Sequence, residues 1–193
     1  VGFINLQWGG GVGGRSSDAA TTLLALNRLW GTGLDRAALQ ALGARLGADV
    51  PFFVFGRNAW VEGVGDRLTA LDLPPAWYLV LVPPVAVPTA AVFAAPELTR
   101  DTEPLKMEDF SAHLAPGRFR NDLEPGVAAK YPPVREHLEW LASQGGGRLT
   151  GSGACVFARF EDRASAEGAL ARLPGGMKGF VARGLEHHPL RDL

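Results

Sequence analysis

Glycines and serines near the start of the chain have the pattern of an anion-binding turn. The segment 9–14 holds five glycines in six positions, and two serines follow Arg15. Glycine lets backbone N–H groups turn toward one point, and a helix that begins at the serines would add its positive dipole end. We expect these residues to bind phosphate: Gly9, Gly10, Gly11, Val12, Gly13, Gly14, Ser16 and Ser17. The alternative is a flexible turn before a Ser-capped helix.

The same segment also has the spacing of a P-loop, G-x-x-x-x-G-K-S, from Gly9 to Ser16, except that Arg15 replaces the lysine. The P-loop lysine reaches the outer phosphates as a compact point charge, and arginine is a poor substitute. A P-loop NTPase also needs a later strand that ends in Asp, whereas the strand predicted over 78–82 runs into Pro83. The P-loop therefore ranks second.

Apolar spacing predicts the elements that would position these residues. In the first part they are a strand over 3–8, a helix capped by Ser16 or Ser17 that runs to about Trp30, a helix capped by Asp35, and strands over 52–55 and 58–62. The expected apolar faces are Ala19, Leu23, Leu26 and Trp30 on the first helix, and Leu39, Leu42 and Leu46 on the second.

Pro74-Pro75 reads as a hinge, and strands and helices alternate after it. The expected elements are strands over 77–82, 148–150, 155–160 and 179–184, and helices from Pro88, around 134–141 and over 163–173. Two of these strands are joined tightly around Ser152-Gly153. This order is typical of an α+β plait, with helices on one face of an antiparallel sheet.

Composition excludes several classes of protein. The 193 residues are 47% hydrophobic with a net charge of −1, which argues against a nucleic-acid or anionic-membrane partner held by bulk charge. The only cysteine, Cys155, excludes an internal disulfide and is expected to be a core thiol.

His113 and His137 are expected in surface segments, and His187-His188 in a solvated tail. We expect a cytoplasmic protein, monomeric or homodimeric, without a membrane span.

Three segments together resemble the GHMP kinases. Gly9–Ala20 resembles the family's central motif P-x-G-G-G-L-G-x-G-S-S-x-A-A, Leu46–Phe53 resembles L-G-A-D-V-P-[FV]-F, and Leu149–Phe157 resembles L-T-G-[ST]-G-[AG]-C-V-F. A glycine run alone is a weak signal. Three segments in the family's order, spread over nearly the whole chain, make a specific one.

The resemblance implies an α+β fold of two domains: the remaining part of an S5-like, ATP-binding domain over 1–73, and a ferredoxin-like α/β plait over 74–193. It implies a small-molecule kinase that uses ATP and Mg²⁺, with no dedicated metal site of its own. The implied acceptor is the 2-hydroxyl of a cytidine-diphosphate-linked methylerythritol, a step of the non-mevalonate isoprenoid pathway.

The match also carries over candidate site residues. Asp49 is the implied catalytic base, which agrees with the need of a weakly nucleophilic hydroxyl for a carboxylate that takes its proton. Pro51 would stiffen the turn that holds it. The alternative is that Asp49 only caps a helical turn.

The substrate positions come from the same match, in which Val87-Pro88-Thr89 with Phe93 and the run 121–124 also fit the family's pattern. Thr89 could bond a polar group and Phe93 could stack on cytosine, although an aromatic in an apolar helix is usually core. The implied substrate-side loop is Thr150, Gly151, Ser152 and Gly153, for which a plain hairpin turn is the alternative.

Two features depart from the family's pattern. Gln7, Trp8 and Arg15 stand where the family has proline, a small or apolar residue and glycine. The family's first motif, P-A-K-L-N-L, has no counterpart from Val1 onward, so we expect an N-terminally truncated chain that is inactive or nearly so alone. A non-catalytic remnant of the fold is the remaining alternative.

Overall fold

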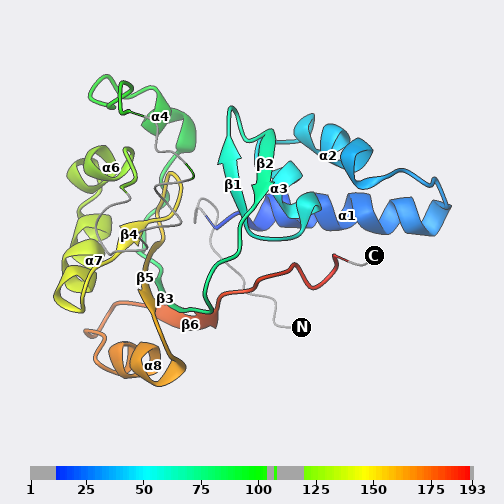
Figure 1. The fold of residues 1–193 in the computed structure, drawn as a ribbon. Helices are drawn as coiled ribbons and strands as arrows, with labels where there is room; N and C mark the ends of the chain where they lie inside the picture. Colours follow the sequence, from blue (N-terminus) through cyan, green and yellow to red (C-terminus); the bar gives the residue numbers. More distant parts are fainter. Residues whose placement is uncertain (1–11, 104–106, 108–119, 192–193) are drawn as a thin grey trace. The chain divides into compact units, whose positions relative to one another are not determined.

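The computed structural model describes residues 12–103, 107 and 120–191 (Figure 1). The strand expected over 3–8 and the predicted phosphate-binding residues Gly9, Gly10 and Gly11 lie outside this range, as does His113. Among the described helices, none is both long and apolar enough to cross a membrane.

The described residues form two compact units. One contains Gly13–Pro75 together with the residues from Leu185 onward, and the other contains Ala76–Gly184. The chain therefore leaves the first unit after Pro75 and returns to it after Gly184. The expected domains 1–73 and 74–193 stay a prediction.

The first unit is built from three helices and a β-hairpin. Its elements are α1 (Gly14–Trp30), α2 (Arg36–Ala44), α3 (Val50–Phe55), β1 (Ala59–Glu62) and β2 (Arg67–Ala70). β1 and β2 pair antiparallel. The sequence predicted a strand at β1 but none at β2. The three helices pack around one small core, made of Ala20, Leu24, Leu39, Val50 and Val54.

Glycines with positive φ mark both ends of α1. The N-cap is Gly13, with φ 69° and no side-chain cap, so the prediction that Ser16 or Ser17 caps the helix is wrong. Both serines lie inside the first turn, because Gly13 adopts the left-handed conformation that starts the helix earlier. At the other end the N–H of Gly31, at φ 62°, donates to Arg28 O at 3.3 Å.

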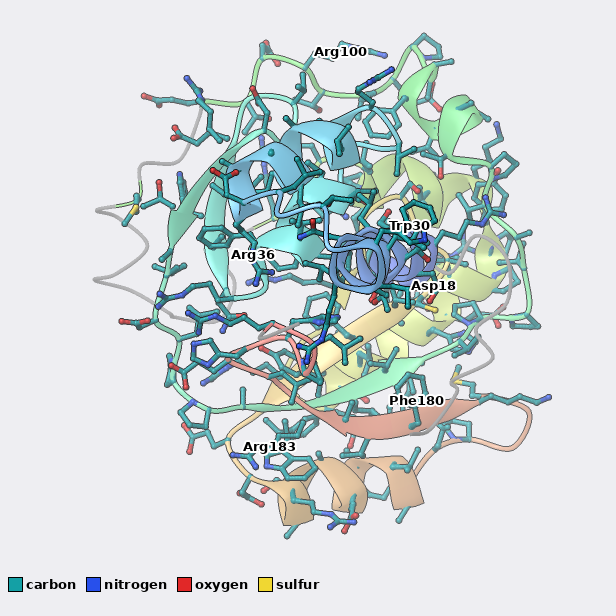
Figure 2. The ribbon with its side chains drawn as sticks, turned by 90° about the vertical axis from the view of Figure 1, so that its right-hand side faces the viewer. Asp18, Trp30, Arg36, Arg100, Phe180 and Arg183 are labelled. Carbon is teal, nitrogen blue, oxygen red and sulfur yellow. The ribbon has the colours of Figure 1, made fainter. Side chains whose placement is uncertain are left out.

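The buried faces of α1 and α2 differ from the expected ones. On α1 the fully buried residues are Ala20 and Leu24, one position beyond the expected Ala19 and Leu23, which are half-buried. Trp30, at the end of α1, is 68% exposed (Figure 2). Apolar residues occur on several sides of α1, so sequence spacing alone did not identify the stripe that α2 and α3 cover.

On α2 the buried pair is Leu39 and Gly43, while Leu42 and Leu46 are exposed. Gly43 is buried because α3 packs closely against it: a Cβ there would lie 2.9 Å from Cγ1 of Val50. The predicted cap is confirmed, since the Asp35 carboxylate accepts from Ala38 N–H at 2.8 Å.

The strand expected over 52–55 is wrong, because these residues belong to α3. Val50 and Val54, one helical turn apart, are both buried, and Pro51 lies in the first turn, where its missing N–H costs nothing. Gly56, at φ 76°, ends the helix. The aromatic and β-branched residues favoured a strand, but proline before and glycine after them are the usual boundaries of a short helix.

The second unit contains a four-stranded antiparallel sheet in the order β4-β5-β3-β6. Its elements are β3 (Trp77–Leu81), α4 (Thr89–Phe93), α6 (Glu124–Lys130), α7 (Pro132–Ser143), β4 (Arg148–Leu149), β5 (Val156–Phe160), α8 (Arg163–Ala171) and β6 (Gly179–Arg183). This order of strands and crossover helices is that of a ferredoxin-like plait, as expected. Only α6 was not predicted.

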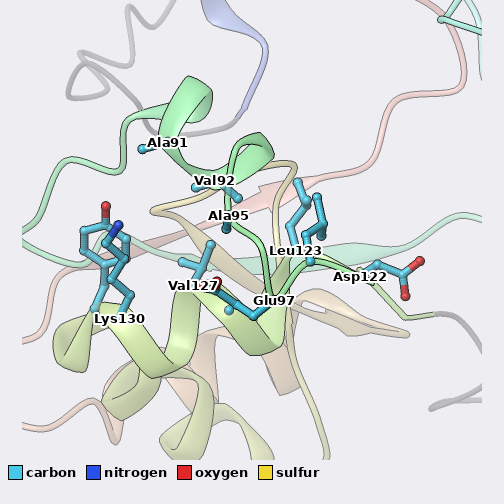
Figure 3. Close-up of a pocket in the computed structure, with 11 residues that line it drawn as sticks. Ala91, Val92, Ala95, Glu97, Asp122, Leu123, Val127 and Lys130 are labelled. Atoms are coloured by element: carbon cyan, nitrogen blue, oxygen red, sulfur yellow. The ribbon is translucent and has the colours of Figure 1, made fainter. Parts of the chain in front are cut away.

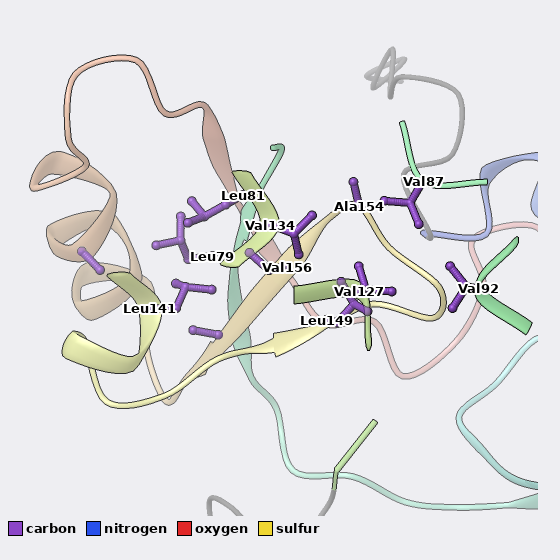
Figure 4. Packing of buried hydrophobic residues seen from close by; sticks show 12 residues of the cluster. Leu79, Leu81, Val87, Val92, Val127, Val134, Leu141, Leu149, Ala154 and Val156 are labelled. Carbon is purple, nitrogen blue, oxygen red and sulfur yellow. The ribbon is translucent and has the colours of Figure 1, made fainter. Parts of the chain in front are cut away.

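One face of this sheet carries the larger core (Figure 4). Leu79 and Leu81 of β3 stand opposite Ala158 and Val156 of β5, and all four are buried. Helices α7 and α8 contribute Val134, Leu141 and Ala169 to the same cluster. His137 of α7 is 3% exposed, so its expected surface position is wrong. Its Nδ1 lies 2.6 Å from Pro133 O.

Candidate functional site

The start of α1 is the described part of the predicted phosphate-binding segment. Among the described residues, no side chain caps this helix and its first turn holds no acidic residue, so none of them offsets the positive end of its dipole. Gly13 packs tightly: a Cβ there would lie 2.7 Å from Cζ of Phe53. A Cβ at Gly14 would meet no heavy atom within 4 Å. The helix start is therefore held from one side and open at Gly14.

Asp49 occupies the N-cap position of α3, but its side chain makes no capping hydrogen bond. Asp49 therefore stands at the capping position without a capping bond from its side chain, and its role as catalytic base stays a prediction. The residue is exposed, and the turn before it is held by Val50 N–H, which donates to Gly47 O at 3.1 Å. Asp49 has helical backbone angles, so Phe53, four residues on, lies on the same side of α3. Because Phe53 contacts Gly13, this side of α3 faces the start of α1.

The hairpin turn between β1 and β2 supports the backbone next to Asp49. Gly65 has φ 100°, and a Cβ on it would lie 2.7 Å from the carbonyl oxygen of Ala48. Asp66 Oδ1 closes the turn by accepting from Val64 N–H at 3.1 Å. Gly65 therefore permits a close approach that any other residue would block.

In the second unit, the segment Thr150–Gly153 forms a loop between β4 and β5. Thr150 N–H donates to Cys155 O at 3.0 Å, and Gly153 N–H donates to Thr150 O at 2.8 Å. Gly151 and Gly153 have φ of 48° and 91°, which favour glycine. The turn expected here is confirmed, and it is more elaborate than a plain hairpin.

Two polar side chains hold this loop, one just before α6 and one at its first residue. Asn121 Nδ2 donates to Leu149 O at 3.1 Å and to Gly151 O at 2.6 Å. Glu124 Oε2 accepts from Leu149 N–H at 2.7 Å. The sequence showed both residues only as part of a matching run, without a role. Their partners are far along the chain, so no local pattern could have revealed them.

Helix α4 presents the two predicted substrate residues side by side. Thr89 and Phe93 are one turn apart, and the Oγ1 of Thr89 lies 2.8 Å from the Oγ of Ser152 in the loop. Phe93 is 55% exposed, so the interpretation of Phe93 as a core residue is wrong. Arg100 Nη2 donates to Phe93 O at 2.7 Å and steadies the end of the helix.

The other side of α4 lines a pocket against α6 (Figure 3). Its empty volume is about 350 Å³, including space open to solvent. Val92, Leu123 and Val127 make its apolar floor, while Lys130 and Glu97 bring charges to it. None of the predicted site residues lines this pocket, so it is separate from Thr89 and Phe93.

The remaining candidates have structural roles. Burial raises the pKa of the Cys155 thiol, which is 1% exposed and lies in the core, as expected. His187 is exposed, as expected for a solvated tail, whereas His188 is half-buried and its backbone N–H donates to Gly56 O at 2.9 Å, so the expectation is wrong for His188. Burial first, and then Arg36, lower the pKa of His188. Within the described ranges, no three His, Cys, Asp or Glu side chains are grouped to hold a metal ion.

Comparison with known proteins identifies the family. Residues 5–57 match the model described as "GHMP kinases N terminal domain", and residues 102–179 match "GHMP kinases C terminal". A protein of Nitrosomonas europaea named 4-diphosphocytidyl-2-C-methyl-D-erythritol kinase is 54% identical over 97% of this chain and 67% of its own length. The chain belongs to the GHMP kinase family. Members of this family use ATP as phosphate donor, generally with Mg²⁺. The P-loop alternative is therefore set aside.

Other relatives bear the same name. The protein of Thiobacillus denitrificans is 60% identical over 97% of this chain, and that of Aromatoleum aromaticum is 56% identical over 96%. The chain spans 66% and 64% of the length of these two relatives, slightly less than two thirds.

Solved structures agree with the GHMP kinase fold. A crystal structure of 4-(cytidine 5'-diphospho)-2C-methyl-D-erythritol kinase superposes with a TM-score of 0.77 and 35% identity, over 93% of this chain and 68% of that one. A homoserine kinase from Cytophaga hutchinsonii superposes with a TM-score of 0.65 over 95% of this chain and 68% of that one. At 17% identity, the second supports the fold alone.

Proposed function

We propose that the protein transfers the γ-phosphate of ATP to the 2-hydroxyl of 4-diphosphocytidyl-2-C-methyl-D-erythritol, a step of the non-mevalonate isoprenoid pathway. The names of its relatives, at up to 60% identity over 97% of the chain, support this reaction and substrate. A cytoplasmic location and a monomeric or homodimeric state stay predictions.

The observation that carries the proposal is the contact between Gly13 and Phe53. It joins the uncapped start of α1, where a phosphate would be stabilised, to α3, the helix that follows Asp49. Phosphoryl transfer needs these two features near each other, because the acceptor hydroxyl must meet the terminal phosphate in line. Among the described helices of this unit, only α1 begins at a glycine without a side-chain cap and lies beside a carboxylate, that of Asp49, that makes no capping bond.

In this proposal the N–H groups at the start of α1 bind the phosphates of ATP, and Ser16 and Ser17 supply hydroxyl groups beside them. Mg²⁺, when bound, would offset the charge of the phosphate oxygens. The open side of Gly14 leaves room for such an anion. Asp49 accepts the proton of the acceptor hydroxyl as its oxygen attacks the γ-phosphorus.

Within the second unit, the residues that the family's motifs assign to the acceptor are Thr89, Phe93 and the Thr150–Gly153 loop. The exposed ring of Phe93 is available to stack on cytosine, a contact worth about 1–3 kcal/mol where it occurs in other proteins. Thr89 and the Thr150–Gly153 loop offer hydroxyl and backbone N–H groups. These roles depend on the family's motifs and on the exposure of the residues.

The test is the Asp49→Asn substitution, assayed by release of ADP with the cytidine-linked acceptor. It is made in a full-length version of the protein, because the chain alone is expected to be inactive or nearly so. We expect the rate of transfer to fall about 10²–10⁴-fold, because a general base is lost, while ATP binding measured by calorimetry is unchanged. The matched control is Asp35→Asn, which replaces an exposed N-cap in the same unit by an equally good cap. Its activity should equal that of the unsubstituted protein.

Other results would decide against the proposal. Full transfer by Asp49→Asn would remove Asp49 from the chemistry. ATP turnover that does not depend on the acceptor would contradict a small-molecule kinase. Absence of any heat with ATP would favour the non-catalytic remnant.

A further inference from the structure

Leu149 of β4 lies at the outer edge of the sheet formed by the described strands. Among these strands β4 pairs with β5 alone, and Thr150 N–H points toward β5 because it donates to Cys155 O. Backbone groups of successive residues in a strand point to opposite edges, so the N–H and C=O of Leu149 point outward. Leu149 is 2% exposed, and so water cannot freely satisfy these groups.

Asn121 and Glu124 take the place of the missing strand. Glu124 accepts from the N–H of Leu149 at 2.7 Å, and Asn121 Nδ2 donates to its carbonyl oxygen at 3.1 Å. These two bonds are the pair that a neighbouring strand would exchange with Leu149. They satisfy the edge of β4 completely at this residue.

The amide of Asn121 reaches further than this edge. Its second N–H donates to Gly151 O at 2.6 Å, and its Oδ1 accepts from Leu123 N–H at 3.0 Å. One planar group therefore fixes the backbone at Leu149, Gly151 and Leu123. Two donors and one acceptor in this arrangement are what an amide offers, and a carboxylate has no donor when ionised.

The bond to Gly151 acts on the exposed tip of the loop. Gly151 is exposed and Ser152 half-exposed, while Gly153 is buried. Two side-chain bonds reach this tip: Asn121 Nδ2 donates to the Gly151 carbonyl oxygen, and the Thr89 hydroxyl is hydrogen-bonded to the Ser152 hydroxyl. A shift of the Gly151 carbonyl would therefore move the residues that the proposed function assigns to the acceptor.

We propose that Asn121 is a positioning residue, which holds the Thr150–Gly153 loop in the shape that binds the acceptor, with Glu124 as the second support. This inference rests on the proposed function, because it assigns the loop to the acceptor. Asn121 does not touch the reacting atoms. It acts through the backbone of Leu149 and Gly151.

The decisive variant is Asn121→Asp, which keeps the size of the side chain and the bond from Leu123 N–H. Its carboxylate would face the oxygens of Leu149 and Gly151 without a proton to donate. We expect kcat/KM for the acceptor to fall about 100-fold at pH 8, the loss that a displacement near 1 Å can cause. Protonation of the carboxylate introduced at position 121 would restore a donor. The ratio of kcat/KM between the unsubstituted protein and the variant should therefore shrink as the pH is lowered.

The matched control is Asn27→Asp in the first unit. Asn27 also fastens a loop with its amide, since Nδ2 donates to Leu34 O at 3.0 Å and Oδ1 accepts from Leu34 N–H at 3.0 Å. It belongs to no predicted site. We expect Asn27→Asp to lower the melting temperature while kcat and KM change less than about 2-fold, because surface loops away from a site tolerate change.

A milder variant, Asn121→Ser, guards against failure of Asn121→Asp to fold. It removes the bonds to both carbonyls without placing a charge there, and we expect a loss of about 10-fold in kcat/KM. A folded Asn121→Ser protein, judged by circular dichroism, with unchanged kinetics would overturn the proposal. So would a loss in Asn121→Asp that is independent of pH. These kinetics are measured in the full-length version of the protein, and if its unsubstituted form does not phosphorylate the acceptor, the proposed function fails instead.

Discussion

Gly13 and the Thr150–Gly153 loop both depend on glycines with positive φ, but different groups hold them. Gly13 has φ 69° and is held by the ring of Phe53 and by the helix that follows. The loop, with Gly151 at φ 48°, is held by a hydrogen bond from Asn121 and by the hydrogen bond between the hydroxyls of Thr89 and Ser152. One turn is fixed by packing, and the other by polar side chains.

The difference indicates what each turn has left to offer a ligand. In the part of the chain that the structure describes, no side chain caps the start of α1, so none of these residues competes with an anion for its first N–H groups. In the loop, the carbonyl groups of Leu149 and Gly151 are already taken by Asn121. The first turn is therefore suited to bind charge, and the second to present a fixed shape.

The largest expected effect in this comparison belongs to Gly13→Ala. A left-handed alanine costs about 1–2 kcal/mol, and the new Cβ would lie 2.7 Å from Cζ of Phe53, so the ring must move. We expect a loss of about 2–4 kcal/mol in the free energy of unfolding, measured with urea, together with weaker ATP binding. Gly31→Ala is the control, with φ 62° and no heavy atom within 4 Å of its Cβ. Equal losses in the two variants would show that packing does not hold the turn.

The second effect concerns Glu124→Ala. It leaves the N–H of the buried Leu149 without its partner, which costs about 1–3 kcal/mol. Glu124→Gln keeps an acceptor in place and should lose less than half as much, because only the charge is removed. Urea denaturation of both variants measures the difference. If Glu124→Ala is as stable as the unsubstituted protein, this side chain does not hold β4.

A smaller effect is expected for Thr89→Val, which keeps the shape of the side chain and removes the bond to Ser152. Both hydroxyls are partly exposed, so the stability should fall by only about 0.5–1 kcal/mol. KM for the acceptor should rise. A double-mutant cycle with Ser152→Ala measures the coupling of the pair. Additive effects of the two substitutions would mean that the bond does not help to hold the loop.

The smallest effect is the acid dependence that Asp162 brings to the second unit. Asp162 caps α8, and its pKa is lowered chiefly by the hydrogen bond from Ser165 N–H and then by that from the Ser165 hydroxyl. Because its pKa is lower in the folded state, the Asp162 carboxylate stabilises the fold at pH values above its unfolded-state pKa. This stabilisation is lost as the pH falls through the folded-state pKa. Asp162→Asn keeps a cap that does not titrate. Its stability should therefore vary less over that acidic window, and an unchanged pH profile would contradict this role.

Much of the fold follows from local patterns. The strands β3 and β5, the helix α7 and the cap at Asp35 were predicted, because apolar period and cap chemistry are local properties. The strand expected over 52–55 was wrong because β-branched and aromatic residues also suit a short helix that buries Val50 and Val54 against its neighbours. Which face of α1 is buried depends on those neighbours too, and was missed for this reason.

The candidate site divides in the same way. Family motifs identified Asp49 and the loop at 150–153, and the structure adds that Asp49 makes no cap and that Phe93 is exposed. The support from Asn121 could not be predicted, because it joins residues 28 and 30 positions apart. The site assignments themselves stay predictions until the substitutions are measured.

The return of the chain to the first unit has a consequence for biosynthesis. His188 N–H donates to Gly56 O at 2.9 Å, and Arg36 donates to Val54 O at 2.8 Å and to the carbonyl oxygen of Arg191. Helices α1 to α3 leave the ribosome long before residues 185–191, which follow the whole second unit. The unit that is made first therefore completes its native contacts last. An N-terminal domain usually folds first during synthesis. Here the first unit cannot form all of its native contacts until residues 185–191 have been made.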